Sequence, residues 1–385
     1  MPLSIRGNTL PESQERLVAQ FSVGHNAHPV SDEAREKELA APRFGTVFTD
    51  HMARISWNRS TGWGHGRIEP YGPIPLDPAT AVLHYAQEVF EGLKAYRHPD
   101  GTIWTFRPGR NARRLNKSAA RLALPELPTD LFTAAVAALV RIDSDWVPSS
   151  PDSSLYLRPF MFASEPFLGV RAANNVEFLV IASPAGAYFA GGVHPVSIWV
   201  DGDYHRAAPG GTGGVKAGGN YAASLLPQAL AARKGFDQVL YLSASNDGVE
   251  ELGGMNLIVV RKDGTVETPP TSGSILEGVT RASLLRLAED RGHQVLERKF
   301  TLRELVEGIE SGDIVEAFAC GTAAVVTPVG RLAGKLPDAP KGERKFDVTI
   351  GDGQPGPLTM SLREELTGIQ YGLIPDRHNW MLRLV

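Results

Sequence analysis

The stretch Gly210–Tyr221 holds the residue of this chain with the clearest capacity for chemistry, Lys216. The stretch contains six glycines, and Lys216 stands in it between the apolar residues Val215 and Ala217. Glycine has no Cβ, so such a backbone can approach a flat ligand or a phosphate closely. Burial lowers the pKa of a lysine, and an amine of lowered pKa can form a Schiff base with an aldehyde. Taken alone, however, a glycine-rich stretch with one lysine is more often a flexible surface loop.

Two nucleotide-binding patterns do not fit this stretch. Lys216 is followed by alanine rather than by serine or threonine, so the P-loop pattern is missing. The stretch also contains no Gly-x-Gly-x-x-Gly. The chemistry of Lys216 must therefore be inferred from the other residues that could surround it.

Two adjacent glutamates, Glu250 and Glu251, stand before the apolar run Leu257–Val260, which is typical of a buried strand. Successive residues of a strand point to opposite faces of the sheet. At most one of the two carboxylates can therefore face a given site, and the sequence offers one candidate acid.

Two turns could hold an anion. Gly278–Arg281 precedes a helix predicted over 282–290, and the backbone N–H groups at a helix N-terminus form an anion site. Gly321 and Thr322 form a predicted turn between two strand-like runs. Its N–H groups and hydroxyl could hold a phosphate or a carboxylate.

Two groups of arginines could bind anionic groups as well. Asn111–Ser118 begins a basic helix whose arginines could bind a phosphate, although a solvated helix face is the alternative. Tyr156 and Arg158 lie on one face of a predicted strand. Together they would form a carboxylate site, and a peripheral ion pair is the alternative.

The element pattern predicts two domains joined by a loop rich in Gly, Ala and Pro. Asp100-Gly101 indicates a hairpin, and Thr301 with Glu304 and Ser361 with Glu364 have capping-box spacing. The predicted parts are an N-terminal arm at 1–40, a small α/β domain at 41–182, an interdomain loop at 183–195 and a large domain at 196–385.

Composition excludes several classes of protein. The chain has 385 residues, 42% hydrophobic, and a formal net charge of −4, without the clustered basic face that nucleic-acid binding needs. One cysteine, Cys320, leaves no internal disulfide and no cysteine-based zinc site. Residues 1–8 lack the apolar segment of a signal peptide, and the longest apolar run, Ala134–Val140, is far below the roughly 18 residues of a spanning helix. We expect a soluble cytoplasmic protein without a metal, nucleic-acid or membrane partner.

Eight motifs, in order along the chain, carry a resemblance to a known family. The motifs are FGTVFTDHM (44–52), FEGLKAY (90–96), the spacing of Asn111 to Arg114, YLRP (156–159), VKAGGNY (215–221), EELGGMN (250–256), GVTR (278–281) and CGTAAVV (320–326). With these motifs the sequence resembles the branched-chain-amino-acid aminotransferases, which are fold-type IV enzymes that use pyridoxal 5'-phosphate.

The resemblance implies a mixed α+β or α/β fold of two domains, like that of the D-amino-acid aminotransferases, with the active site between the domains. It makes Lys216 the cofactor-linking and proton-transferring lysine, Glu251 the partner of the pyridine nitrogen and Tyr221 the donor to the phenolic oxygen. It assigns the phosphate to Arg114, to the amides of Val279 and Thr280, and to Thr322.

The resemblance also implies a substrate pocket and a homodimer. Thr322 and Ala323 would bind the substrate carboxylate, and the side-chain pocket would consist of Phe44, Tyr85, Phe90, Tyr156 and Arg158. The positions of Tyr85, Leu168 and Val170 would be lent by the other subunit. The implied reaction is reversible ping-pong transfer of the amino group from Leu, Ile or Val to 2-oxoglutarate.

Two other functions remain open at this point. One is a fold-type IV relative, such as a D-amino-acid aminotransferase or an aminodeoxychorismate lyase, which YLRP and CGTAAVV disfavour. The other is a non-catalytic binding protein on this fold, which the presence of Lys216 and Glu251 disfavours. The sequence departs from some family members, which carry Cys-x-x-Cys just after the Gly-Thr turn, because Ala324 and Thr327 occupy those positions. Redox regulation by that pair is therefore not expected, and Cys320 is predicted to be a buried strand cysteine.

Overall fold

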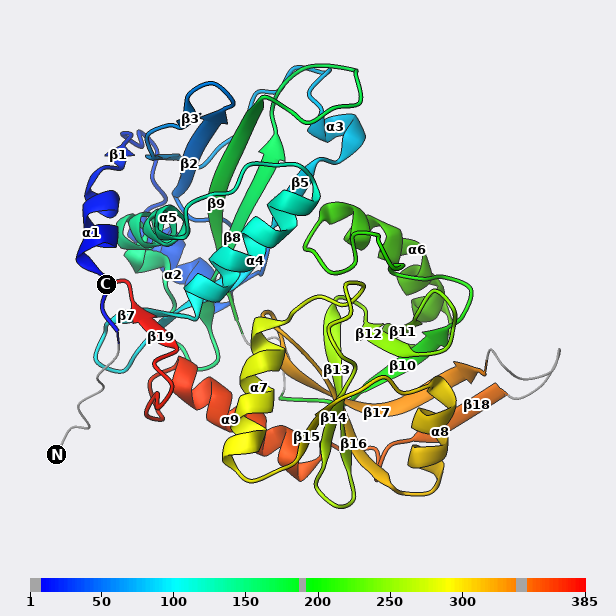
Figure 1. The fold of residues 1–385 in the computed structure, drawn as a ribbon. Coiled ribbons are helices and arrows are strands. Elements are labelled where there is room, and N and C mark those ends of the chain that lie inside the picture. The colour runs from blue at the N-terminus through cyan, green and yellow to red at the C-terminus, as the bar shows by residue number, and fades with distance from the viewer. Residues whose placement is uncertain (1–7, 187–191, 337–344) are drawn as a thin grey trace. The chain divides into compact units, whose positions relative to one another are not determined.

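The computed structural model describes residues 8–186, 192–336 and 345–385 (Figure 1). Its internal contacts divide the chain into two compact units. The first unit comprises the described residues up to 186 together with Gly368–Val385, and the second comprises the described residues from 192 to Thr367. Both units combine helices with sheet, which confirms the expected mixed α/β class. The expected active site between the domains stays a prediction.

The first unit is built on one large sheet. Within the described residues the sheet has ten strands, in the order β1-β4-β2-β9-β8-β6-β7-β19, with β3 paired to β2 and β5 to β8. The strands are β1 (Ser22–Val23), β2 (His51–Asn58), β3 (Gly62–Trp63), β4 (Arg67–Pro70), β5 (Glu88–Phe90), β6 (Leu93–Arg97), β7 (Ile103–Phe106), β8 (Ser154–Ala163), β9 (Asn175–Ala185) and β19 (Met381–Arg383). β6 and β7 pair antiparallel, and Gly101 lies between them with a φ of 84°, so the predicted hairpin is confirmed.

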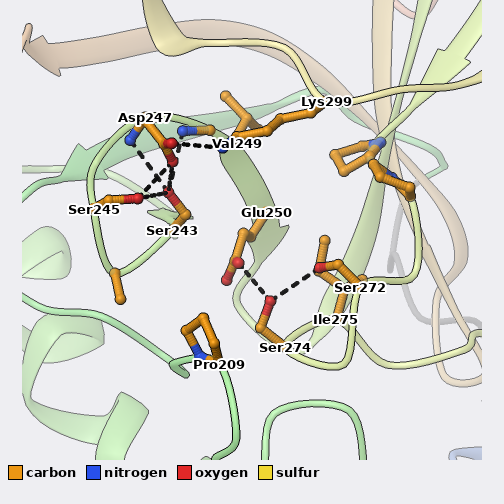
Figure 2. Close-up of a pocket in the computed structure, with 14 residues that line it drawn as sticks. Pro209, Ser243, Ser245, Asp247, Val249, Glu250, Ser272, Ser274, Ile275 and Lys299 are labelled. Carbon is orange, nitrogen blue, oxygen red and sulfur yellow. Dashed lines mark hydrogen bonds and ion pairs between the residues drawn. The ribbon is translucent and has the colours of Figure 1, made fainter.

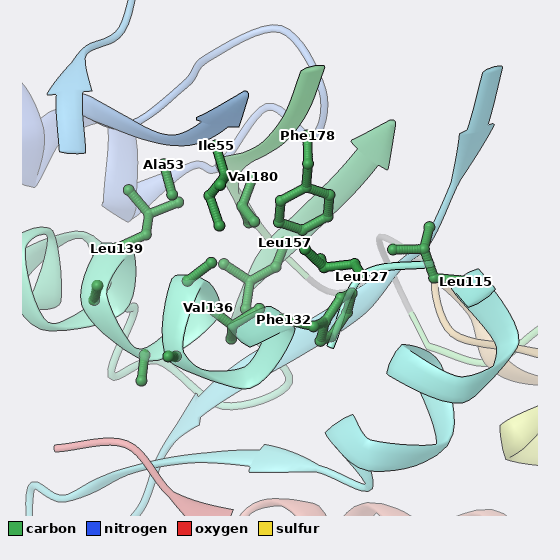
Figure 3. Close-up of a cluster of buried hydrophobic side chains, with 14 of the residues drawn as sticks. Ala53, Ile55, Leu115, Leu127, Phe132, Val136, Leu139, Leu157, Phe178 and Val180 are labelled. Atoms are coloured by element: carbon green, nitrogen blue, oxygen red, sulfur yellow. The ribbon is translucent and has the colours of Figure 1, made fainter. Parts of the chain in front are cut away.

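Helix α5 (Thr129–Ile142) packs against the sheet in the core of the first unit (Figure 3). All residues from Phe132 to Val140 are buried, and Figure 3 shows side chains of this helix directed at those of Ile55 and Phe178 on the sheet. The rings of Phe132 and Phe178 lie 6.0 Å apart. The helices of this unit are α1 (Glu12–Ala19), α2 (Asp32–Ala40), α3 (Val82–Tyr85), α4 (Pro108–Arg121), α5 (Thr129–Ile142) and the short 3-10 helix at Ser144–Trp146.

The second unit contains a mixed sheet of nine strands among the described residues, in the order β12-β11-β10-β17-β16-β13-β14-β15, with β18 paired to β17. The strands are β10 (Val196–Asp201), β11 (Gln238–Leu242), β12 (Val249–Leu252), β13 (Met255–Arg261), β14 (Val266–Thr268), β15 (Val295–Glu297), β16 (Ile314–Gly321), β17 (Val325–Lys335) and β18 (Lys345–Thr349). The helices are α6 (Gly218–Arg233), α7 (Val279–Asp290), α8 (Leu302–Glu310) and α9 (Pro357–Gln370).

The ends of the chain differ from the expected domain plan. The predicted large domain ran to residue 385, but Gly368–Val385 belongs to the first unit. There β19 pairs with β7, and Met381 and Leu384 are buried. Residues 8–40 are also part of the first unit rather than a separate arm, since Leu10 and Phe21 are buried in its core. Residues 1–7 of the predicted arm, and 187–191 of the predicted interdomain loop, lie outside the described residues.

The two predicted capping boxes have different outcomes. The box at α8 is confirmed, because Thr301 and Glu304 exchange hydrogen bonds of 3.0 and 2.7 Å between side chain and backbone. The box with Ser361 is wrong, because α9 begins at Pro357 and Ser361 lies inside it. The carboxylate of Glu316 instead accepts the backbone N–H groups of Leu358 and Thr359 at 3.1 and 2.8 Å.

Candidate active site

The segment before Lys216 is held in a defined shape. Asn220, in the first turn of α6, is buried, and its side-chain amide donates to the carbonyls of Thr212 and Val215 at 2.8 and 2.9 Å. A Cβ added to Gly213 would lie 2.4 Å from the carbonyl oxygen of Ser274, so this glycine allows a close backbone approach. The alternative of a loose surface loop therefore does not describe this stretch.

The amine of Lys216 lies beside Tyr221. Lys216 Nζ donates to Tyr221 Oη at 2.6 Å, and the nitrogen is 4.9 Å from the centre of the tyrosine ring. Lys216 lies two residues before the start of α6, and Tyr221 lies within the first turn of that helix. The start of α6 therefore brings together the lysine that the resemblance links to the cofactor and the tyrosine that it assigns to the phenolic oxygen.

Glu251 is one of the buried carboxylates of the second unit. It lies in β12 opposite Asn256 of β13, is 2% exposed, and accepts the backbone N–H of Leu276 at 2.5 Å. Its carboxylate lies 3.2 Å from Nε of Arg206, whose side chain is 6% exposed. Burial raises the pKa of Glu251 to about 7, although Arg206, the Leu276 amide and Lys216 each act to lower it. A nearby cationic ring would stabilise the ionised form further.

Glu250 has different surroundings from Glu251. Its carboxylate accepts the Ser274 hydroxyl at 2.6 Å and lines a cavity of which Glu251 is not a part. The strand β12 thus presents its two carboxylates to different neighbours, as the alternation of side chains along a strand requires.

The predicted anion-binding turns both lie in the second unit. Val279 and Thr280 form the first turn of α7, where backbone N–H groups have no partner within the helix. A Cβ on the preceding Gly278 would lie 2.0 Å from Oδ1 of Asn256, so this entry to the helix requires glycine. Such a helix start is suited to a phosphate.

Thr322 and Ala323 lie in the turn between β16 and β17, which pair antiparallel up to Gly321 and Val325. Val325 has a φ of 62°, which is rare for a β-branched residue and costs about 1–3 kcal/mol. The backbone of this turn is therefore strained at Val325, and backbone strain is common at ligand-binding positions.

Arg114 belongs to the first unit and is not part of a solvated helix face. It is 9% exposed and donates through Nε and Nη2 to the fully buried Glu91 at 2.7 and 2.8 Å. Asn111 donates to the same carboxylate at 2.8 Å. Since removing one partner of a buried ion pair typically costs about 3–5 kcal/mol, Glu91 fixes the position of this arginine.

Four of the predicted pocket residues form one cluster in the first unit. Arg158 Nη2 donates to Tyr156 Oη at 3.2 Å, and its guanidinium lies 4.8 Å from the centre of the Phe90 ring. Phe44 packs edge-on against Tyr156, with ring centres 4.9 Å apart. Nε of Arg158 is buried without a hydrogen-bond partner among the described residues. The cluster combines aromatic surface with one guanidinium, whose position suits an anionic group.

The other predicted pocket residues lie together as well. Tyr85 Oη donates to the carbonyl of Leu168 at 2.5 Å. Leu168 and Val170 are 73% and 92% exposed, which is unusual for side chains of this type. These three residues therefore form an exposed, mostly apolar edge of the first unit.

We expect Gly92→Ala to disrupt the cluster around Tyr156. A Cβ at this position would lie 2.1 Å from Tyr156 Oη, so the ring must move or the strand must shift. Overpacking of this kind costs about 1–3 kcal/mol, which urea unfolding would measure. Gly109→Ala in α4 is the matched control, because its added Cβ would meet its nearest neighbour, Arg113, at 3.6 Å. Equal stability of the Gly92 and Gly109 variants would contradict the packing shown here.

Three supporting residues escaped the sequence analysis. Arg206 pairs with Glu251 and also donates to the backbone carbonyls of Gly213 and Ser274. Glu91 holds Arg114, and Asn220 holds the segment before Lys216. Glu91 and Asn220 lie within two of the motifs and Arg206 lies outside all of them, and neither position indicates the partners of these residues. Cys320 is buried in β16 as predicted, and burial raises the pKa of its thiol to about 12.

One known protein family matches most of the chain. Residues 88–332 match the family described as amino-transferase class IV. Because the match covers more than half of the chain, the chain belongs to the class IV aminotransferases, which use pyridoxal phosphate.

Two relatives indicate which family within this class the chain belongs to. The branched-chain-amino-acid aminotransferase of Mycolicibacterium smegmatis is 53% identical over 370 residues, which are 95% of this chain and 98% of that protein. The probable branched-chain-amino-acid aminotransferase of Streptomyces coelicolor is 54% identical over 358 residues, 92% of this chain and 96% of that protein. This chain is thus a member of the branched-chain-amino-acid aminotransferase family.

A solved structure of the same family supports the fold. The branched-chain amino acid aminotransferase of Escherichia coli has a TM-score of 0.70 and 27% identity, covering 86% of this chain and 99% of that one. No helix within the described ranges is both long enough and apolar enough to cross a membrane.

The residues of the second unit fit pyridoxal phosphate. They offer an amine beside a phenol, a buried carboxylate able to pair with a cationic nitrogen, and the N-terminus of α7 for a phosphate. The donor set therefore matches the three polar parts of that cofactor.

Proposed function

We propose that this chain transfers the amino group of Leu, Ile or Val to 2-oxoglutarate, reversibly and by a ping-pong mechanism. The observation that carries this proposal is the second-unit set of Lys216, Tyr221 and the buried Glu251. The names of the relatives support the substrate class, and a related solved structure holds N-(5'-phosphopyridoxyl)-L-glutamate.

Each residue of that set has a distinct role in the proposed reaction. When bound, the cofactor supplies an electron sink for the negative charge that develops at the substrate Cα. Lys216 Nζ holds the cofactor and, once free, carries the proton away from Cα. Tyr221 Oη accepts a hydrogen bond from that amine at 2.6 Å and so orients it. Glu251, held by Arg206 and the Leu276 amide, keeps a proton on the pyridine nitrogen.

We assign the substrate side chain to Phe44, Phe90, Tyr156 and Arg158. The rings offer apolar surface for a branched side chain, whose burial is worth roughly 1.5–3 kcal/mol. Arg158 offers a charge-assisted hydrogen bond to the distal carboxylate of glutamate, worth about 1.5–3 kcal/mol. Thr322 and Ala323 are assigned to the α-carboxylate that all these substrates share.

Arg158→Leu should slow the glutamate half-reaction about tenfold or more relative to the leucine half-reaction. The variant removes the guanidinium beside Tyr156 but leaves apolar surface. Single-turnover rates with leucine and with glutamate measure the two effects separately. If both rates fell by the same factor, Arg158 would be a general structural residue and the assignment would fail.

We further propose a homodimer in which Tyr85, Leu168 and Val170 serve the site of the other subunit. The exposure of Leu168 and Val170 supports this, because a second subunit would remove this apolar edge from water. Sedimentation of the purified chain tests it, since a monomer at catalytic concentration would refute it. A cytoplasmic location completes the proposal, and cell fractionation tests that part.

The experiment that tests the function is a visible spectrum followed by a panel of amino donors. We expect a yellow protein, with Leu, Ile and Val as the preferred donors to 2-oxoglutarate. A colourless protein would favour a non-catalytic binding protein. Preference for D-alanine would favour a D-amino-acid aminotransferase.

A further inference from the structure

The second unit contains a cavity on the side of β12 that carries Glu250 (Figure 2). Its volume is about 440 Å³, enough for a small organic molecule. The segment after β11, the start of β12, the segment from Pro269 to Ile275, and the residues Pro209 and Lys299 line it. None of the residues assigned above to the cofactor or the substrate lines this cavity.

Glu250 is the buried charged residue in the lining of this cavity. It is 7% exposed, and one of its carboxylate oxygens accepts the Ser274 hydroxyl at 2.6 Å. The other oxygen, Oε2, is buried without a hydrogen-bond partner among the residues that the structure describes. A buried acceptor left unpaired costs about 1–3 kcal/mol, and more when it is charged. A ligand with N–H donors would therefore remove a penalty that the protein carries in its absence.

The charges around the cavity favour a cation. Asp247 and Lys299 lie at its exposed side and form an ion pair of 2.6 Å, so their charges offset each other. Asp247 also accepts the hydroxyls of Ser243 and Ser245. Glu250 then remains as the uncompensated charge of the lining. The rest of the surface is largely apolar, with three prolines, Pro209, Pro269 and Pro270, and Ile275.

We propose that this cavity binds a small organic cation, with N–H donors directed at Glu250 and an apolar body against the prolines. An amidinium or guanidinium suits the carboxylate because its parallel N–H groups match the two oxygens. The site is separate from the one assigned to the substrate, so such a ligand would act as an effector rather than as an amino donor.

The position of the cavity connects it to Glu251, and this consequence rests on the proposed function. Glu250 and Glu251 are neighbours in β12, and the short segment that supplies Ser274 to the first supplies the Leu276 amide to the second. Arg206 pairs with Glu251 and donates to the carbonyl of Ser274. The charge of Glu250 disfavours ionisation of Glu251. A bound cation would offset that repulsion and favour the ionised Glu251.

Calorimetric titration of the cofactor-loaded enzyme with benzamidinium chloride tests the proposal. Benzamidinium carries a planar N–H fork on an apolar ring, and it is not an aliphatic amine that would compete for the cofactor aldehyde. We expect one site per chain, and at least tenfold weaker binding of the uncharged benzamide. Glu250→Gln should weaken benzamidinium binding at least tenfold. The control Glu289→Gln, on α7 and outside the cavity, should leave it unchanged.

A second variant tests the place of binding without altering Glu250. Ala244 is exposed and lines the cavity, so Ala244→Trp should obstruct it without disturbing the core. The proposal would be overturned if the unaltered enzyme showed no measurable binding of benzamidinium. It would also be overturned if the unaltered enzyme, Glu250→Gln and Ala244→Trp all bound benzamidinium equally.

The absorption of the bound cofactor should also shift on titration with benzamidinium, with the same midpoint as binding. Binding without that shift would overturn the connection to Glu251, and neither result depends on which amino acid the enzyme prefers.

Discussion

Replacement of Lys216 by alanine is expected to lower the turnover rate by about 10²–10⁴-fold, which is the contribution of a positioned proton-transfer group. The variant loses the amine that lies 2.6 Å from Tyr221 Oη. It should still bind pyridoxal phosphate weakly, because the start of α7 and the carboxylate of Glu251 remain. Single-turnover absorbance changes on mixing with leucine measure the loss.

Lys234→Ala is the matched control for this prediction. Lys234 follows the last residue of α6, the helix that begins beside Lys216, and its amine lies 3.7 Å from the centre of the Trp199 ring. Removal of this charge should leave the rates of both half-reactions within about twofold of those of the unaltered enzyme, since surface substitutions usually change stability by no more than about 0.5 kcal/mol. A Lys216 variant with the turnover of the Lys234 variant would refute the assignment.

Replacement of Glu251 by glutamine should slow both proton-transfer half-reactions by about a hundredfold or more, the scale of losing one preorganised electrostatic partner. The amide can still accept the Leu276 N–H but no longer favours a protonated pyridine nitrogen. Glu250→Gln should have a much smaller effect, because its carboxylate faces Ser274 and the cavity instead. Equal losses in the two variants would mean that the alternation of side chains along β12 does not separate their roles.

The cofactor-free protein offers a test of Glu251 through stability. Burial raises the pKa of this carboxyl to about 7 in the folded state, above its ordinary value of 4.5. Between these values the folded state binds more protons than the unfolded state, so the free energy of unfolding falls as the pH rises. The fall should begin near pH 4.5 and end above pH 7. In the Glu251→Gln variant, urea unfolding measured across that pH range should show no such fall in the free energy of unfolding. If the variant and the unaltered protein had the same pH dependence, the prediction would be contradicted.

Local features of this fold are predictable from the sequence. The hairpin at Asp100-Gly101 and the capping box of Thr301 and Glu304 depend on residues at most a few positions apart. The opposite surroundings of Glu250 and Glu251 follow from strand geometry alone. The resemblance to the family then supplied a role for Lys216, which the glycine-rich stretch could not establish by itself.

Features that depend on distant partners were not predictable. The group that caps the start of α9 is Glu316, 42 residues before Leu358, and the capping-box spacing of Ser361 and Glu364 did not identify it. The strand β19 joins the first unit through a pairing with β7 that its short sequence does not specify. Arg206 reaches the carbonyl of Ser274, 68 residues away, which no local pattern encodes.

Lys216 is assigned above as the residue that carries the cofactor. Borohydride reduction of the enzyme loaded with pyridoxal phosphate, followed by proteolysis and mass spectrometry, tests it most directly. We predict a single phosphopyridoxyl label, on the peptide that contains Lys216, and its loss in Lys216→Ala. A label on the peptide of Lys94 or Lys117 instead, with none at Lys216, would contradict the account.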